Sequence, residues 1–402
     1  MKMASSAPRL AILVTDGEQR SALATVRALG RAGHRVFVSS ALTRPLAGAS
    51  RYTVRVVRTA DPLCEPETFI DQVSSTVRKW KIDVVLPMTD ASMLAMLAAR
   101  THLEPAIVPC AERESYAAVS NKQAVLAVAP TYGIAVPAQR TVCMEDVPLL
   151  DPHRLDFPIV VKPAKTVGEH NGQRQRFSVR YARDANELTR IVRASEPAAF
   201  PLLLQQRVVG PGVGIFLLTW DDETIATFAH KRLREKPPSG GVSVYRESIV
   251  ADPELVLRSR ALLDHFGWRG VAMIEYKIDA ATGTPYLMEI NGRFWGSLQL
   301  AIDAGVDFPN LLMAAAVHGE RPHIDAYRIG VRSRWWWGDV DQLITRLRRS
   351  PDTLALPPDS PTRWQAMREF VRFWNRNDRN EILRMDDPWP FVQESMDWLR
   401  GK

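Results

Sequence analysis

The stretch VAMIEYKIDAATGTPYLMEINGRFWGSLQ, residues 271–299, decides the fold of this chain. It contains two runs, Val271–Ile278 and Pro285–Ile290, in which apolar residues alternate with polar or charged ones, and a turn rich in Asp, Thr and Gly separates them. An alternation with a period of two is typical of β-strands. Two such runs joined by a turn predict a β-hairpin.

Acidic and amide side chains gather on one face of this predicted hairpin. Glu289 and Asn291 point the same way, and Glu275 on the partner strand can lie opposite them. Facing carboxylates repel each other and lose hydration, so they need a compensating charge. A divalent cation is one solution, because two carboxylates and an amide carbonyl suit Mg²⁺, and Arg293 could then hold phosphate. The alternative is that both glutamates pair with nearby Lys277 and Arg293 on a solvated face, and spacing alone leaves the two even.

The order of these residues resembles the metal-binding signature of the ATP-grasp superfamily of carboxylate ligases. In that signature a Glu on one strand precedes E-x-N-x-R at the end of the next, and here Glu275 precedes EINGR at residues 289–293. Gly292 stands where the family more often has Pro, which removes no ligand. The resemblance covers most of the chain between residues 9 and 319. Two longer strings carry it further: FAHKRLREKPPSGGVSVYRES (228–248) and MEINGRFWGSLQLAIDAGVDFP (288–309).

The resemblance implies an α/β (α+β) fold made of three parts. These are a Rossmann-like pre-ATP-grasp domain (1–115), a two-lobed ATP-grasp domain (116–319, with lobes at about 116–204 and 205–319) and a Trp/Arg-rich, mainly helical C-terminal extension (320–402). The residues agree for the first part, where strand, turn, helix and strand patterns follow one another at 9–15, 16–17, 19–32 and 35–39. That order predicts a right-handed crossover and a parallel sheet.

Polar residues follow two of the predicted N-terminal strands. Because ligands at parallel sheets bind beyond the strand C-termini, Asp16, Gly17, Arg20, Thr89 and Asp90 should lie at one edge of this sheet. The first turn, TDGEQRS, lacks the G-x-G-x-x-G pattern, which disfavours dinucleotide binding. In the family this domain commonly helps to hold the non-nucleotide substrate. The alternative is that both aspartates are helix caps.

Two lysines are the expected nucleotide ligands. Ser120 and Gln123 predict a capping box at the start of a helix, and Lys122 between them matches a family residue that reaches a nucleotide phosphate. Lys162 ends the apolar strand FPIVVKP, where a lone ammonium needs an anion or a route to solvent. The resemblance makes Lys162 the lysine that bridges phosphate and adenine.

Glycines follow this lysine. Gly168 and Gly172 in KTVGEHNGQRQRF fit the mobile loop that closes over phosphates in the family, and the alternative is an ordinary hairpin turn. Strand is expected to resume over Arg176–Val179.

The run LLLQQRVV, residues 202–209, fits the hinge strand whose backbone reads the adenine edge in the family. Gln205 and Gln206 stand at the usual polar positions, and Val208 would supply the backbone contact. The family's ribose-binding Glu is not found about seven residues further on.

A predicted loop, RLREKPPSGG, concentrates positive charge between two strands. Its Arg232, Arg234 and Lys236 suit a mobile segment that meets a transferring phosphoryl group or a carboxylate, and the alternative is a solvated hairpin tip. With Arg293, Arg232 and Arg234 are the expected catalytic cations. The implied cofactors are ATP and Mg²⁺, with Mn²⁺ as the other candidate ion.

The implied reaction is ATP-dependent activation of a carboxylate as an acylphosphate, followed by attack of an amine. The partners would then be small-molecule carboxylate and amine substrates. Three alternatives stay open: an ATP-grasp enzyme with another acceptor (carboxylase-like or kinase-like), a non-catalytic nucleotide-binding module, and a nucleic-acid-binding role for the extension.

Composition and the extension add limits to these expectations. Among 402 residues the net charge is +7 without charged runs, three cysteines show no metal spacing, and no apolar run is long enough for a membrane. We therefore expect a cytoplasmic enzyme that binds no membrane, with nucleic acid disfavoured and a homodimer left open. The extension predicts helices over 339–349 and 362–375, and we expect its Trp and Arg side chains to pack together rather than to stack nucleobases.

Overall fold

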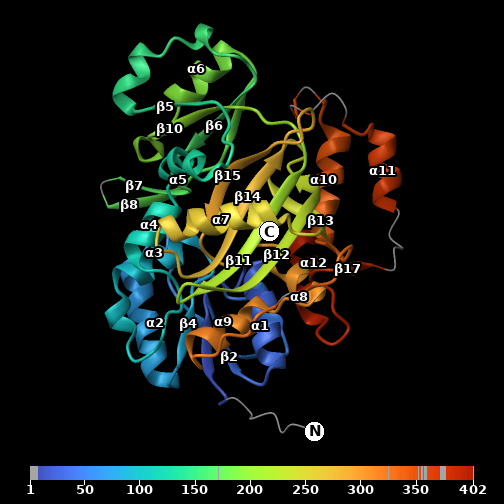
Figure 1. Cartoon of the computed structure of the whole chain (residues 1–402). Coiled ribbons are helices and arrows are strands. Elements are labelled where there is room, and N and C mark those ends of the chain that lie inside the picture. The colour runs from blue at the N-terminus through green and yellow to red at the C-terminus, as the bar shows by residue number, and fades with distance from the viewer. Residues whose placement is uncertain are drawn as a thin grey trace.

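The computed structural model describes residues 8–170, 172–324, 326–351, 353–354, 356, 360–371 and 377–401. Its α/β architecture holds three main sheets and a small hairpin. Figure 1 shows the N-terminal sheet at the bottom, a smaller lobe at the top and the largest sheet between them. Short 3₁₀ helices join the larger elements: η1 (Leu46–Ala49), η2 (Arg100–Leu103), η3 (Ala129–Tyr132), η4 (Met144–Leu149), η5 (Pro152–Arg154) and η6 (Pro197–Ala199).

The N-terminal sheet is parallel and has the strand order β3-β2-β1-β4. Its strands are β1 (Ala11–Val14), β2 (Arg35–Ser40), β3 (Thr53–Arg58) and β4 (Val84–Leu86), and its helices are α1 (Arg20–Arg31), α2 (Pro66–Trp80), α3 (Asp90–Ala98) and α4 (Arg113–Val119). β1 and β4 are wholly buried because their apolar runs are covered on both faces. The predicted parallel sheet is confirmed.

The expected edge of this sheet is also confirmed. The Asp16 carboxylate accepts hydrogen bonds from the Thr89 and Ser92 hydroxyls, which brings the ends of β1 and β4 together. The alternative of two aspartate caps is wrong. Thr89 caps α3, with Asp90 as its first residue, and the residue before α1, Gln19, makes no side-chain cap bond.

The smaller lobe is an antiparallel sheet of order β5-β10-β6-β9 with a separate hairpin, β7–β8. Its elements are α5 (Lys122–Val128), β5 (Gln139–Val142), β6 (Ile159–Pro163), β7 (Val167–His170), β8 (Gln173–Arg176), β9 (Arg180–Ala182), α6 (Ala185–Arg193) and β10 (Leu202–Gln206). Apolar side chains from β6, β10 and α6 form its own core cluster.

Two local expectations in this lobe are wrong. Asn121, not Ser120, caps α5, because its side chain accepts from the amides of Gln123 and Ala124. Ser120 instead donates its hydroxyl proton to a carbonyl of the preceding helix. The strand expected over 176–179 is also absent, since β8 ends at Arg176 and β9 begins at Arg180.

The largest sheet has seven strands in the order β15-β14-β11-β12-β13-β16-β17. The elements that form and cover it are β11 (Gly212–Trp220), β12 (Glu223–Lys236), β13 (Val242–Ser248), α7 (Pro253–His265), β14 (Gly270–Ile278), β15 (Pro285–Asn291), α8 (Leu298–Ala304) and α9 (Phe308–Ala316). The predicted hairpin is β14–β15, and it is antiparallel as expected. β14 pairs with β11 on its other side, so it lies inside the sheet.

The C-terminal extension is more than a helical layer. Its strands β16 (Arg332–Arg334) and β17 (Asp378–Asn380) continue the largest sheet, and α10 (Trp336–Arg348), α11 (Arg363–Val371) and α12 (Trp389–Leu399) lie beside it. The first predicted helix starts three residues earlier than expected, at Trp336. The second is described only to Val371, so its predicted end and Trp374 lie outside the described residues.

Several half-buried tryptophans of the extension pack against other side chains. Trp337 stacks on Trp398 with ring centroids 4.1 Å apart, and the Arg334 guanidinium lies 4.9 Å from the Trp336 ring. Trp364 and Trp389 are exposed. Aromatic and cation–π packing therefore accounts for Arg334, Trp336, Trp337 and Trp398. Within the described residues, no helix is long and apolar enough to cross a membrane.

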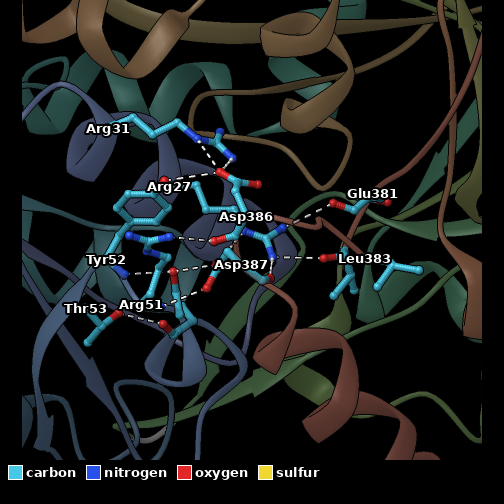
Figure 2. Close-up of polar contacts among 12 residues, drawn as sticks. Arg27, Arg31, Arg51, Tyr52, Thr53, Glu381, Leu383, Asp386 and Asp387 are labelled. Atoms are coloured by element: carbon cyan, nitrogen blue, oxygen red, sulfur yellow. Dashed lines mark hydrogen bonds and ion pairs between the residues drawn. The ribbon is translucent and has the colours of Figure 1, made fainter.

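Buried ion pairs join the extension to the N-terminal sheet (Figure 2). The Arg27 Nε lies 2.8 Å from Asp387 Oδ2, and both side chains are fully buried. Asp387 also accepts from the Ser50 hydroxyl and the Arg51 amide. Because a buried charge is costly without its partner, this pair makes the position of the extension depend on α1.

Replacing Asp387 by Asn should lower the stability by about 3–5 kcal/mol, because Arg27 would keep a buried charge without its partner. The matched control is Asp386→Asn, since Asp386 pairs with Arg31 at the surface. That change should cost less than about 1 kcal/mol. Urea unfolding followed by tryptophan fluorescence measures both values, and equal losses would contradict a stabilising role for the buried pair.

Another buried contact inside the extension gives a pH dependence. The Trp335 indole N–H donates to Glu394 Oε1 at 2.7 Å. Burial raises the pKa of Glu394 to about 7. An unfolded chain releases this proton near its ordinary pKa of 4.5, so the folded state loses stability as the pH rises from about 4.5 to about 7.

Glu394→Gln should therefore stabilise the protein at pH 8.5 by up to ~3 kcal/mol and change little at pH 4.5. The amide keeps an acceptor for Trp335 and carries no charge. Thermal melts across this pH range test the expectation, with exposed Glu320→Gln as the control. A gain that is the same at every pH would contradict it.

Candidate functional site

The β14–β15 register places the predicted acidic residues together. Glu275 is the direct cross-strand partner of Glu289, and Asn291 faces Met273 two pairs further on. The Asn291 amide donates to Glu289 Oε1 at 3.4 Å. The expected face with two carboxylates and an amide is confirmed.

Each of the two carboxylates is neutralised by a cation from another element. Lys122 Nζ of α5 lies 3.2 Å from Glu289 Oε2, and Arg232 Nη2 of β12 lies 2.5 Å from Glu275 Oε2. Lys277 lies instead 3.8 Å from Glu235. The alternative in which Lys277 and Arg293 balance the pair on a solvated face is therefore wrong.

These surroundings shift the pKa values of the two carboxylates in opposite directions. Burial by itself would raise the pKa of Glu289, but Lys122 and Lys162 outweigh it and lower that pKa to about 2. Burial raises the pKa of Glu275, and Arg232 opposes it. At neutral pH Glu289 is thus the firmly ionised member of the pair.

Lys162 lies at the end of β6 and faces this pair across the cleft between the sheets. Its Nζ lies 3.7 Å from the Met288 sulfur, a weak acceptor, and among the described residues it forms no ion pair with a carboxylate. Burial lowers its pKa to about 8 despite the field of Glu289 and Glu275. A bound anion would relieve this cost.

Arg293 joins the site to the N-terminal sheet. Its Nη2 lies 3.0 Å from Asp90 Oδ2 and 3.3 Å from Asn291 Oδ1. Tyr116 of α4 donates its hydroxyl proton to the other Asp90 oxygen. Asp90 therefore positions the arginine next to the acidic pair.

Six of the thirteen predicted site residues line one cavity of about 330 Å³. They are Lys162, Arg232, Glu275, Glu289, Asn291 and Arg293. An adjoining cavity of about 270 Å³ is lined by Lys122 and also bordered by Asn291. Gly168 does not line it, but the preceding residue, Val167, does. Both cavities meet at the end of β15.

The oxygen donors of this site fit a magnesium ion. Glu275, Glu289 and Asn291 offer two carboxylates and an amide, the hard ligands that Mg²⁺ prefers. Among the described residues no group of three or more His, Cys, Asp or Glu could hold a metal. A three-ligand set of this kind leaves coordination positions for phosphate oxygens and water.

The predicted cationic loop is only partly a loop: residues 237–241 form the turn before β13, but Arg232, Arg234 and Lys236 lie in β12, so the expected mobile cationic segment is wrong. β12 runs to Lys236 because it pairs with β13 along this whole segment. Arg234 forms a two-point ion pair with Asp339 of α10, at 2.7 and 2.6 Å, and Lys236 pairs with Asp341. Arg232 borders the main cavity, whereas Arg234 and Lys236 do not line it.

The predicted glycine loop is the β7–β8 hairpin. Gly172 lies in its turn at a φ of 75°, which favours glycine. A Cβ on Gly168 would lie 2.0 Å from the Ala198 carbonyl oxygen, so close packing against η6 requires glycine there. The hairpin turn that the sequence left as an alternative is thus the observed structure.

The predicted adenine-reading residues lie at the end of β10. Gln205 is buried, and its amide donates to the Gln139 side chain of β5 at 2.8 Å. Gln206 is exposed, and Val208 follows the strand. Their contacts with a nucleotide remain a prediction.

Sequence reasoning did not single out two residues of the main cavity, His230 and Trp295. Their positions in apolar strand and loop patterns make them look like ordinary core residues. It also gave Arg20 only a place at the sheet edge. His230 stands directly before Lys231 and Arg232 in TFAHKR, so no signal in the sequence separates it from an ordinary polar strand residue.

Residues 199–337 match the family model described as "ATP-grasp in the biosynthetic pathway with Ter operon". This segment contains the β14–β15 hairpin and its acidic pair. The protein carries an ATP-grasp domain.

A curated relative and solved structures agree with this ATP-grasp assignment. A "Putative D-alanine--D-lactate ligase" of Streptomyces coelicolor is 26% identical over 231 residues, which are 53% of this chain and 64% of that protein. The alignment thus spans somewhat less than two thirds of the relative.

Similar folds occur among solved structures. The L-amino acid ligase of Bacillus licheniformis has a TM-score of 0.60 at 18% identity, with 77% of this chain and 75% of that chain covered. Biotin carboxylase of Campylobacter jejuni has 0.62 at 14%, covering 81% and 74%. N5-carboxyaminoimidazole synthetase of Staphylococcus aureus, complexed with ADP, has 0.60 at 12%, covering 82% and 83%. At these low identities the structures show similarity of fold alone.

Lys162→Met should weaken MgADP binding about 10- to 100-fold, because one charge-assisted phosphate contact is worth about 1.5–3 kcal/mol. Lys231→Met is the matched control, since Lys231 is exposed on β12 and borders none of the cavities described above. Isothermal titration calorimetry measures both constants. Equal affinities of the two variants would contradict a phosphate-binding role for Lys162.

Proposed function

We propose that this protein is an ATP- and Mg²⁺-dependent ligase that activates a substrate carboxylate as an acylphosphate for attack by an amine. One observation carries the proposal: an ATP-grasp fold holds the facing Glu275–Glu289 pair, with Asn291, in the same cavity as the half-buried ammonium of Lys162. Such a site suits a phosphate chain and its metal ion. Lys162 would then receive the anionic partner that it lacks among the described residues.

The lysines and the arginine would divide the work of holding the nucleotide. Lys122 and Lys162 would bind the α- and β-phosphates. Lys122 would then either give up its ion pair with Glu289 or contact Glu289 and a phosphate at the same time. Arg293 would stabilise the transferring group, because Asp90 holds it beside Asn291. Arg232 is committed to Glu275 and Glu235, so it would mainly keep the acidic pair in place.

Magnesium would be held by Glu275, Glu289 and Asn291, and when bound it neutralises phosphate charge during transfer. Mn²⁺ fits the same donors. The γ-phosphoryl group of ATP would pass to a carboxylate oxygen and leave ADP, and the amine would then form the amide bond and release phosphate. These residues contribute positioning and charge, which phosphoryl transfer chiefly needs.

The acceptor is an amine in this proposal, and the similar proteins support a small carboxylate substrate. The curated relative's name pairs an amino acid with a hydroxy acid, and another similar structure is an amino acid ligase. The panel of acceptors should therefore include amino acids of both hands and D-lactate.

The test measures ADP release with MgATP, one carboxylate and one acceptor at a time, in the full chain. Hydroxylamine serves as a general acceptor, because it traps an acylphosphate as a stable hydroxamate. Wild type should release ADP and form a hydroxamate with at least one carboxylate. Glu289→Gln should lose at least 100-fold in rate, and Glu320→Gln should keep the wild-type rate.

ADP release that depends on bicarbonate, without any hydroxamate, would replace the amide ligase by a carboxylase-like enzyme. A phosphorylated alcohol as the product would replace it by a kinase-like enzyme. No MgADP binding and no ADP release with any substrate would refute the catalytic proposal altogether.

A further inference from the structure

Part of the main cavity is lined by polar groups that the nucleotide and the metal ion do not explain. His230 of β12 is fully buried, and neither of its ring nitrogens has a hydrogen-bond partner among the described residues. The same holds for the indole N–H of Trp295, whose side chain is almost fully buried. Both residues line the cavity that contains the acidic pair.

Buried polar groups without partners cost about 1–3 kcal/mol each, so two of them bordering one cavity need an explanation. The His230 ring packs edge-on against Phe216, with centroids 4.7 Å apart, and cannot turn toward other polar groups without losing this contact. Burial, with Arg232 and Arg246 nearby, keeps the pKa of His230 well below its ordinary value. The ring is therefore neutral and has one N–H donor.

Arg20 supplies a third group to the same part of the cavity. Its guanidinium lies 4.0 Å from the centroid of the Trp335 ring, and its Nη1 donates to Glu381 Oε2 at 2.7 Å. Both of these partners belong to the C-terminal extension. Arg20 and Gly296 both line the cavity. A Cβ on Gly296 would lie 3.0 Å from Arg20 Nη2, so the glycine leaves space beside this nitrogen.

Arg20 shares its carboxylate partner with a second guanidinium group, and the other carboxylate near it, Glu394, accepts from the Trp335 indole and has a pKa raised by burial. Glu381 is buried and pairs with both Arg20 and the fully buried Arg246. Two guanidinium groups thus share one carboxylate. A bound carboxylate would add a second anion to the cluster and accept hydrogen bonds from the N–H groups that line the cavity.

We propose that Arg20, His230 and Trp295 form a subsite for a carboxylate group of the substrate, and that Glu381 and Trp335 of the extension position Arg20 in it. This inference rests on the ligase function proposed above and adds the recognition residues. The extension is then part of substrate binding. Arg20, His230 and Trp295 would contact the substrate, whereas Glu381 acts through Arg20.

The test uses thermal-shift titrations of the full chain with saturating MgADP. The probes are L-alanine, D-alanine and D-lactate, each compared with its methyl ester, which lacks the anionic carboxylate. At least one free acid should raise the melting temperature of wild type more than its ester does. MgADP alone is titrated in parallel to report the nucleotide site.

His230→Phe keeps the size of the ring and removes both nitrogens. Because these nitrogens have no partners in the free protein, this variant should melt at a higher temperature than wild type and bind the free acid at least 10-fold more weakly. Its affinity for MgADP should stay within about twofold of wild type. His265→Phe, an exposed histidine on α7, is the matched control.

Arg20→Gln and Glu381→Gln should also weaken the free acid at least 10-fold and leave the ester unaffected. Asp386→Asn is the control for the loss of an ion pair between the extension and α1. Once a productive substrate pair is known, KM for the carboxylate should rise in all three variants while KM for MgATP stays constant.

The outcomes separate this inference from the function itself. If wild type and the variants bind MgADP and the free acid equally well, the subsite is refuted and the ligase proposal stands. If no free acid acts differently from its ester on wild type, the subsite is likewise refuted. A wild type that binds no MgADP would refute both proposals.

Discussion

The structure depends on the cross-strand placement of two half-buried carboxylates, Glu275 on β14 and Glu289 on β15. Two facing carboxylates inside a sheet are unfavourable unless cations reach them, and here each cation comes from a different element. Lys122 arrives from α5 and Arg232 from β12. The acidic pair thus ties the smaller lobe to the largest sheet, and Arg293 with Asp90 ties it to the N-terminal sheet.

The C-terminal extension is likewise held by carboxylates that pair with cations from other elements. Glu381 lies between Arg20 and Arg246, and Asp387 meets the fully buried Arg27 (Figure 2). Removing the extension would take the carboxylate partners away from these guanidinium groups. Together with β16 and β17, which lengthen the central sheet, these contacts make the extension an integral part of the fold.

Local patterns were sufficient for much of the fold and for the acidic part of the site. The alternation in residues 271–290 specified both strands of the hairpin, and the E-x-N-x-R spacing located the oxygen donors. The environment of Arg234 could not be predicted in this way. Glycines and prolines after it indicated a loop, but pairing with β13 and the ion pair with Asp339, 105 positions away, keep it in a strand.

The sequence by itself determined many of the strands and helices, the acidic hairpin among them, and which residues carry oxygen donors and positive charges. Periodicity and short motifs are local properties, so they can be recognised from the sequence alone. Only the tertiary structure decided which cation neutralises which carboxylate, and that His230, Trp295 and Arg20 border one cavity. These pairings join elements far apart in sequence, and their energies depend on burial and distance, which arise only when the sheets pack together.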